Sequence, residues 1–228
     1  MAASTTAPVL PETIYDDLRA SIIAQDPEPG SLVTEASVAT RFGVSRQTAK
    51  VAIERLVAEG VLRREAHRAA RVPVLTVDDV IDLFDNRSLV ESAAVSRLAS
   101  AGIVPSAAIA ANRALVEAAA TGEPFADHDI AFHRALVAGG PSPRLTRLHE
   151  LLLGEIELCI GQVQAAQLIS ATEVGAQHQG ILDALLAGDP ARASQLIEEH
   201  IAGTRDRLVT TSRSRKQTHG QAPVPQPR

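Results

Sequence analysis

Apolar residues recur every three or four positions along most of the chain, and clusters of Gly and Pro separate the periodic segments. Ile14, Leu18 and Ile22 form the first such stripe after Pro11, and the sequence Asp26-Pro-Glu-Pro-Gly30 ends it. A period near 3.6 places apolar side chains on one face of a helix. The pattern therefore predicts a mainly α protein.

Two further helices are predicted within residues 34–60, separated by a tight turn at Gly43. Thr34 and Ser45 stand where side chains cap a helix N-terminus. A helix, a tight turn and a second helix with a polar, basic first turn form a helix-turn-helix pattern; an ordinary solvated helix is the alternative. The candidate DNA contacts here are Thr34, Glu35, Ser45, Arg46, Gln47, Thr48 and Lys50.

Two short extended runs follow, at residues 61–64 and 70–74, with His67 and Arg68 at the tip between them. This arrangement predicts a β-hairpin wing after the helix-turn-helix. The cationic tip of such a wing can contact the DNA backbone or the minor groove. His67 and Arg68 are therefore further candidate DNA contacts.

The rest of the chain reads as successive helices joined by short breaks. The predicted helices cover about residues 77–98, 105–116, 125–137, 145–160, 172–187 and 190–208. We therefore expect a winged helix-turn-helix domain at residues 11–75 and an all-helical bundle domain at 76–209. Residues 1–10 and the basic tail 210–228 lack apolar periodicity and are expected to be disordered.

Composition and charge refine this organisation. Apolar residues make up 45% of the 228, but there is no Trp and only one Tyr, so the core must consist mainly of aliphatic side chains. Residues 41–71 carry a net charge of +5, whereas residues 76–209 carry −9. A basic block beside an acidic remainder indicates a nucleic-acid-binding module attached to a domain with another role.

Localisation follows from what the sequence lacks. No apolar run is long enough for a membrane span, and the N-terminus lacks the pattern of a signal peptide. The lone Cys159 has no intramolecular disulfide partner and fits a reducing compartment. We expect a cytoplasmic protein with no membrane partner.

Four polar residues interrupt the apolar faces of the predicted bundle. Asp129 and His133 are one helical turn apart, and His178 and His200 each lie 11 residues from Asp189 at a helix break. If the last two helices fold back on each other, the two histidines come level. Such a set could bind one divalent ion: zinc first, with nickel or manganese as alternatives, and His149 as a substitute ligand. The alternative is a set of core histidines bonded to carbonyl groups.

The N-terminal segment resembles the winged-helix domain of GntR-family transcription regulators. The resemblance rests on Pro29-Gly30, Thr34-Glu35, Val38-Ala39, Phe42-Gly-Val-Ser-Arg46 and Leu56-Val-Ala-Glu-Gly60-Val-Leu. Two positions depart from the family pattern. Lys50 replaces the second Arg of the third helix, and Ala69 or Ala70 stands where the wing tip usually has Gly.

The C-terminal segment resembles the all-helical FCD effector domain of one GntR branch. The matching segments are Asp129-Ile-Ala-Phe-His-Arg134, His178-Gln-Gly-Ile-Leu-Asp-Ala184 and Asp189-Pro-Ala-Arg-Ala-Ser194 with Glu199-His200. The resemblance implies a divalent metal bound by Asp129, His133, His178 and His200. It also implies an effector site, where Arg87 could bind a carboxylate; an ion pair with Glu91 on the helix surface is the alternative.

These observations together predict a homodimeric transcriptional regulator and not an enzyme. It should bind a pseudo-palindromic operator in double-stranded DNA, with its affinity controlled by a small organic acid bound at or near the metal. A metal-dependent, hydrolase-like enzyme and a pure metal sensor are the alternatives.

Overall fold

The computed structural model describes residues 11–220, so the predictions for residues 1–10 and 221–228 fall outside the described part of the chain. The chain divides into two compact units. Unit 1 comprises the residues up to Val74 together with 153–162, and unit 2 comprises residues 75–152 and those from Val163 onward. Within the described residues, no single helix has the length and hydropathy of a membrane span. The two helices at 77–101 and 106–121 reach that length and hydropathy only when counted together, and they are bent by 118° relative to each other.

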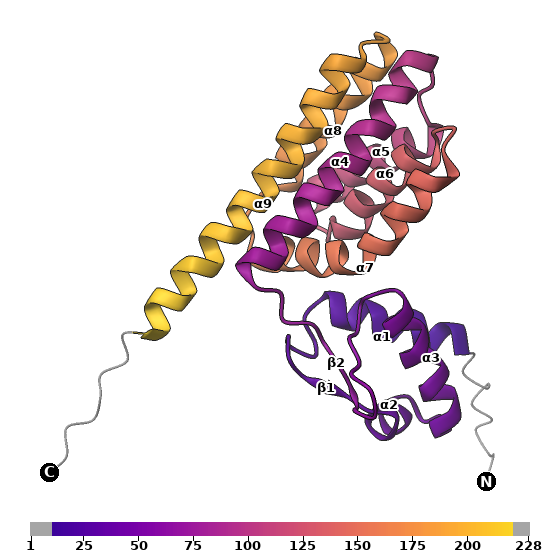
Figure 1. Ribbon diagram of the computed structural model, residues 1–228, viewed down its shortest axis with the longest axis vertical. Coiled ribbons are helices and arrows are strands. Elements are labelled where there is room, and N and C mark those ends of the chain that lie inside the picture. The colour runs from indigo at the N-terminus through magenta and orange to yellow at the C-terminus, as the bar shows by residue number, and fades with distance from the viewer. Residues whose placement is uncertain (1–10, 221–228) are drawn as a thin grey trace, which may run out of the picture. The chain divides into compact units, whose positions relative to one another are not determined.

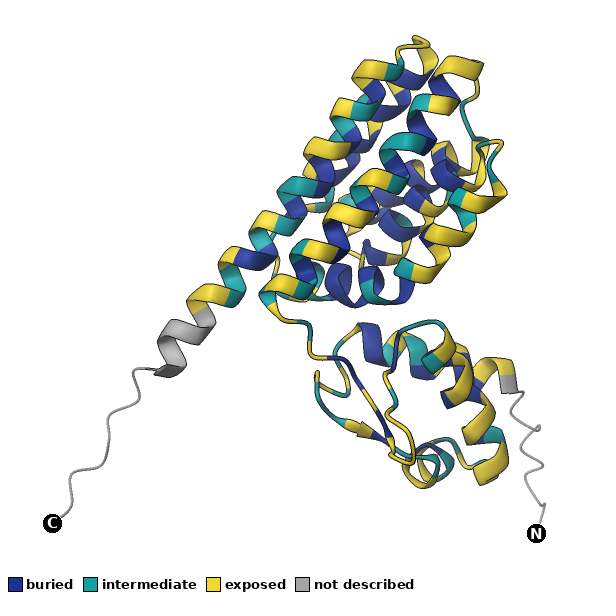
Figure 2. Ribbon diagram, viewed as in Figure 1, coloured by how far each residue is buried: buried dark blue, intermediate teal, exposed yellow. Residues whose placement is uncertain are grey.

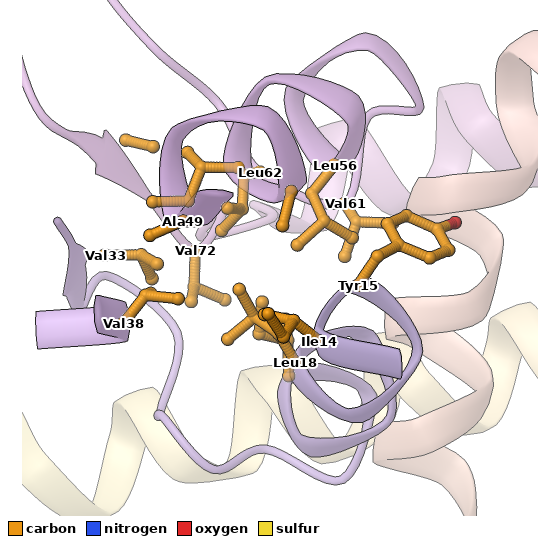
Figure 3. Packing of buried hydrophobic residues seen from close by; sticks show 14 of the residues in the cluster. Ile14, Tyr15, Leu18, Val33, Val38, Ala49, Leu56, Val61, Leu62 and Val72 are labelled. Atoms are coloured by element: carbon orange, nitrogen blue, oxygen red, sulfur yellow. The ribbon is translucent and has the colours of Figure 1, made fainter. Parts of the chain in front are cut away.

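Unit 1 is a small helical domain with a two-stranded sheet (Figure 1). Its elements are α1 (Pro11–Ile23), β1 (Leu32–Val33), α2 (Glu35–Phe42), α3 (Arg46–Ala58) and β2 (Ala70–Arg71). Ile14, Leu18 and Leu56 are almost fully buried in its largely aliphatic core (Figure 3), and Ile53 is buried there too. The predicted stripe on the first helix therefore faces the core.

Local capping explains where α2 and α3 begin. Thr34 forms a capping box with Ser37, and the Ser45 side chain accepts a hydrogen bond from the Thr48 N–H. Gly43 ends α2 in the left-handed conformation with φ +66°, which a residue without Cβ adopts at little cost. The helix-turn-helix pattern and the predicted fold class are both confirmed.

The wing differs from the prediction in its pairing and its turn. β2 pairs antiparallel with β1, while the predicted strand at 61–64 contributes only the Arg63–Arg71 bridge. The positive-φ position of the tip falls on His67, with φ +62°, and not on Ala69 or Ala70. The strand that pairs with β2 is therefore β1, which lies before α2. The apolar pattern of residues 61–64 and 70–74 alone could not reveal this pairing.

Unit 2 is entirely helical within the described residues. It consists of α4 (Val77–Ala101), α5 (Ser106–Thr121), α6 (Ala126–Ala138), α7 (Pro143–Ala165), α8 (Ala171–Leu186) and α9 (Pro190–Gly220), with residues 153–162 of α7 assigned to unit 1. α4 and α9 run side by side over much of their length (Figure 1). Buried and exposed positions alternate by helix face, as Figure 2 shows. This periodicity is the one that the apolar pattern predicts.

The last helix is longer than expected. α9 continues to Gly220, so the prediction of a disordered tail is wrong for residues 210–220. After Gly203 the chain contains neither Gly nor Pro before Gly220, and its Arg, Lys and Gln residues are good helix formers. A helix already nucleated by packing can therefore propagate through a polar segment.

Candidate metal centre

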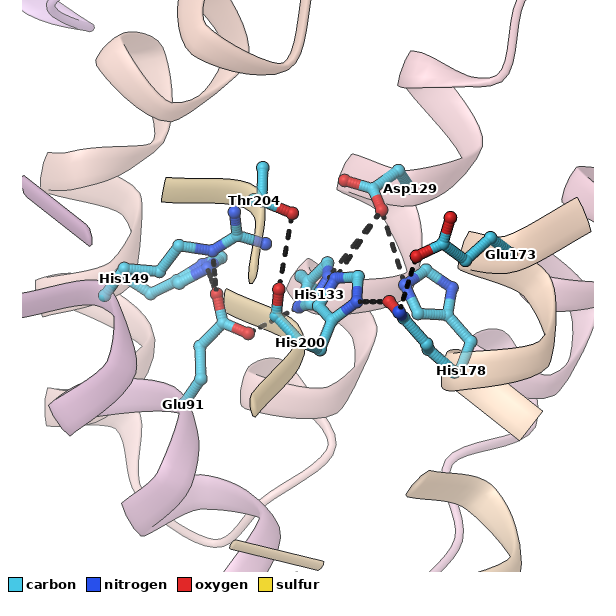
Figure 4. Close-up of polar contacts among 10 residues, drawn as sticks. Glu91, Asp129, His133, His149, Glu173, His178, His200 and Thr204 are labelled. Carbon is cyan, nitrogen blue, oxygen red and sulfur yellow. Dashed lines mark hydrogen bonds and ion pairs between the residues drawn. The ribbon is translucent and has the colours of Figure 1, made fainter. Parts of the chain in front are cut away.

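Asp129, His133, His178 and His200 converge in the interior of unit 2 (Figure 4). Asp129 and His133 come from α6, His178 from α8 and His200 from α9. All four are buried, and one ligand atom from each can be chosen so that all lie within 4.8 Å of one another. A single ion could contact the whole set, so the cluster has the composition and closeness of a metal centre.

A helical hairpin brings the two C-terminal histidines together. Gly188, with φ +64°, forms the turn between α8 and α9. The rings of His178 and His200 lie 4.9 Å apart between centroids. The equal spacing of these residues from the turn predicts this closeness. Their binding of a metal stays a prediction.

Several polar atoms of the cluster lack hydrogen-bond partners. His133 Nε2 lies 3.1 Å from His200 Nε2, and His178 Nε2 lies 3.3 Å from Asp129 Oδ1. Even so, both ring nitrogens of His178 and Oδ2 of Asp129 are buried without a hydrogen bond. Each such atom costs about 1–3 kcal/mol. A bound cation would remove part of this penalty, and the donor set of imidazole nitrogens and a carboxylate suits one.

The electrostatics of the cluster favour neutral imidazoles at His178 and His200 beside an ionised Asp129. Burial lowers the pKa of His178 to about 4 and holds the pKa of His200 well below its ordinary value. Burial alone would raise the pKa of Asp129, but the neighbouring His178, His133 and His200 outweigh it and hold that pKa below its usual range. Neutral imidazole and carboxylate are the forms that coordinate metals.

A second buried group adjoins the cluster on the side of α4. Glu91 accepts hydrogen bonds from Arg87 Nε at 2.7 Å and His149 Nε2 at 3.2 Å, and its Oε2 lies 2.5 Å from His133 Nδ1. Burial opposes ionisation of Glu91, but His133 and Arg87 outweigh it and keep the pKa of this carboxyl well below its usual value.

The structure changes the interpretation of two predicted residues on that side. Arg87 does pair with Glu91, but the two are 1% and 0% exposed, so the alternative of a surface ion pair is wrong. Arg87 Nη1 is buried without a hydrogen bond. His149 lies against Glu91 and outside the four-residue cluster.

A polar chain on the other side connects the cluster to the surface. Gln177 Oε1 lies 2.7 Å from His200 Nδ1, and its amide nitrogen donates to Glu173 at 3.4 Å. Glu173 also pairs with Arg207 at 2.7 Å. Sequence reasoning missed Gln177. Its signal was its place one turn after an acidic residue on a helix that also carries His178.

The predicted DNA contacts lie on α2, α3 and the wing of unit 1. Arg46, Gln47, Lys50, His67 and Arg68 have exposed side chains. The hydroxyls of Thr34, Ser45 and Thr48 engage in cap hydrogen bonds, and Glu35 pairs with Arg64 of the wing segment at 3.5 Å. The first group is accessible to a ligand, with Lys50 paired to Glu54 at 3.6 Å and Arg68 to Glu65 at 3.1 Å on the surface. The second group shapes the helix starts.

A capped helix-turn-helix with a wing, linked to a helical domain with a buried polar centre, defines a DNA-binding regulator. Comparison with known proteins supports this class. The family model for "Bacterial regulatory proteins, gntR family" matches residues 10–72, and the model for the "FCD domain" matches residues 82–203. The chain belongs to the GntR family of transcriptional regulators and carries an FCD domain.

Individual relatives agree with this assignment. One is the "Probable D-xylose utilization operon transcriptional repressor" of Paenarthrobacter nicotinovorans, 31% identical over 79% of this chain and 80% of that protein. Another is the HTH-type transcriptional repressor GlaR of Escherichia coli (strain K12), 28% identical over 82% and 90%. The crystal structure of a GntR regulator from Rhodococcus sp. RHA1 superposes with a TM-score of 0.75 at 25% identity, covering 88% and 97%.

The pKa shifts predict how the stability of metal-free protein depends on pH. His178 has a folded pKa of about 4 against an ordinary value of 6.5, and the pKa of His200 is lowered too, so the unfolded chain binds more protons. This contribution to stability is complete above pH 6.5 and is lost as pH falls toward 4. Denaturant titrations with a chelator present should show unfolding free energy falling over this window. An unfolding free energy that stays constant or rises as the pH falls would contradict the shifts. His178→Leu should reduce the slope of unfolding free energy against pH.

Proposed function

We propose that this GntR-family regulator binds a divalent metal at Asp129, His133, His178 and His200, and that a small organic acid bound at or near the metal controls its affinity for an operator. The observation that supports the proposal best is the convergence of four buried ligand-type side chains, some with unpaired polar atoms. Zinc is the first candidate from the ligand types, with nickel and manganese as alternatives.

The metal would supply positive charge for an anionic effector. With three neutral imidazoles and one carboxylate as ligands, a divalent ion keeps a net charge of about +1 in a buried site, where electrostatic attraction is strong. A carboxylate effector would then complete the coordination. The buried Nη1 of Arg87, which lacks a hydrogen bond, is the group of this chain that could bind the same effector.

Unit 1 would bind double-stranded DNA through the exposed side chains at the start of α3 and at the tip of the wing. Arg46 is placed to contact a base edge or a phosphate, and Lys50 a phosphate. A homodimer would present two such units to the two halves of a pseudo-palindromic operator. The relatives are named as transcriptional repressors, which favours this reading over a hydrolase-like enzyme.

The metal proposal predicts one ion per chain. His178→Ala should weaken zinc binding about tenfold or more, because it removes one of four ligands. His128→Ala is the matched control, since His128 lies on α6 next to Asp129 but outside the cluster. Competition with a chromogenic chelator measures both affinities. Failure of the wild-type protein to take up zinc, nickel or manganese would leave the four residues as a polar core cluster.

The DNA proposal predicts a specific role for Arg46. An operator selected from random double-stranded DNA should bind Arg46→Ala more weakly by about 1–3 kcal/mol at fixed salt if this side chain reads a base. Arg113→Ala removes the same charge from an exposed position on α5 and should change affinity little. Equal affinities of wild type and Arg46→Ala would exclude this register of the helix-turn-helix.

The effector proposal predicts stabilisation by carboxylic acids that depends on the metal. In a thermal-shift screen of small mono- and dicarboxylic acids, an effector should raise the melting temperature of zinc-loaded protein and have little effect with a chelator. Arg87→Lys should weaken that acid about tenfold, because it replaces the guanidinium fork by a point charge. The control Arg97→Lys alters an exposed position on the same helix. An acid that binds equally well without metal would argue against coordination.

A further inference from the structure

The outer nitrogens of two cluster histidines are held by acceptors from other helix positions. His133 Nδ1 lies 2.5 Å from Glu91 Oε2 (Figure 4), and His200 Nδ1 lies 2.7 Å from Gln177 Oε1. In both rings the other nitrogen, Nε2, faces inward, and these two atoms are 3.1 Å apart. The two histidines thus share one orientation although they come from α6 and α9.

The chemistry of the two acceptors determines which nitrogen carries the proton. A neutral imidazole has one N–H and one lone pair, and an ionised carboxylate can only accept. Glu91 therefore requires the proton of His133 to sit on Nδ1. Gln177 likewise requires the proton of His200 to sit on Nδ1. Its amide nitrogen donates to the Glu173 carboxylate, so its oxygen is the atom that accepts from the ring.

The positions of the acceptors are themselves fixed. Glu91 is fully buried and also accepts from Arg87 and His149, so three donors hold one carboxylate in place. Gln177 is held by Glu173, which pairs with Arg207. By contrast, His178 Nδ1 has no hydrogen bond, and its ring stacks on Phe132 at 3.8 Å.

With both Nδ1 atoms protonated, the two Nε2 lone pairs face each other at 3.1 Å. Two acceptors at this distance repel unless a cation or a shared proton lies between them. We propose that Glu91 and Gln177 are positioning residues that fix the tautomers of His133 and His200, so that both Nε2 atoms are directed at one cation. This inference rests on the proposed metal binding at the cluster.

The test combines a structural readout without metal and a binding readout with zinc alone. Imidazole ¹⁵N–¹H correlation spectra of wild-type protein freed of metal with a chelator should show His133 and His200 with the proton on Nδ1. In Gln177→Leu, His200 should populate both tautomers, and zinc affinity measured by chelator competition should fall about 10–100-fold. Thr204→Val is the control, because the Thr204 hydroxyl donates to the backbone oxygen of His200 and not to its ring.

Glu91 needs a variant that does not leave Arg87 buried without its partner. The double substitution Arg87→Met and Glu91→Leu removes both charges of the pair, which proteins often tolerate. It should release the His133 tautomer and also lower zinc affinity about 10–100-fold, with helical circular dichroism retained. Loss of affinity with both tautomers unchanged would overturn the proposal, and so would tautomers that shift without any loss of affinity.

The failure of the proposed function gives a different result from the failure of this inference. A wild-type protein that binds no zinc, nickel or manganese would refute the metal centre. Suppose instead that wild-type protein binds zinc, but its metal-free form carries the His133 or His200 proton on Nε2. This result would refute the positioning role alone.

Discussion

Desolvation of charged groups is the constraint on which the interior of unit 2 depends. Burying a carboxylate or an imidazolium without a partner costs far more than burying an aliphatic side chain. Around Glu91 this cost is offset, because Arg87, His133 and His149 all direct a nitrogen at one carboxylate. Around Asp129 the offset is incomplete, since Oδ2 has no hydrogen bond. The Glu91 carboxylate is thus fully paired, whereas the Asp129 carboxylate keeps one oxygen without a partner.

His133 contacts both the Glu91 group and the Asp129 cluster, so a change at one can alter the other. Its Nδ1 contacts Glu91 on α4, while its Nε2 faces His200 on α9. An anion that competes with Glu91 for Arg87 would alter the position of the carboxylate and with it the ring of His133. Under the proposed function, binding of the acid and binding of the metal would then be coupled through a single imidazole, and such a coupling is reciprocal.

Local chemistry made much of this arrangement predictable. Thr34, Ser45 and Thr76 cap helices as their residue types indicate, and the i, i+4 spacing of Asp129 and His133 places them on one face of α6. What could not be predicted depends on long-range packing. The sequence shows that Arg87 and Glu91 are one turn apart, but it does not show that α6 and α7 cover them. Nor could it assign Gln177 to His200, because that contact crosses from α8 to α9.

The only tyrosine of the chain gives the two units different optical properties. Tyr15 lies in the core of unit 1, where its hydroxyl bonds to Glu59 and the Arg55 guanidinium stacks on its ring at 3.6 Å. The sequence has no tryptophan and the aromatic rings of unit 2 are those of phenylalanine and histidine, so the tyrosine component of near-ultraviolet absorption and emission comes from unit 1 alone. Its melting can therefore be followed separately, against the far-ultraviolet helical signal of the whole chain.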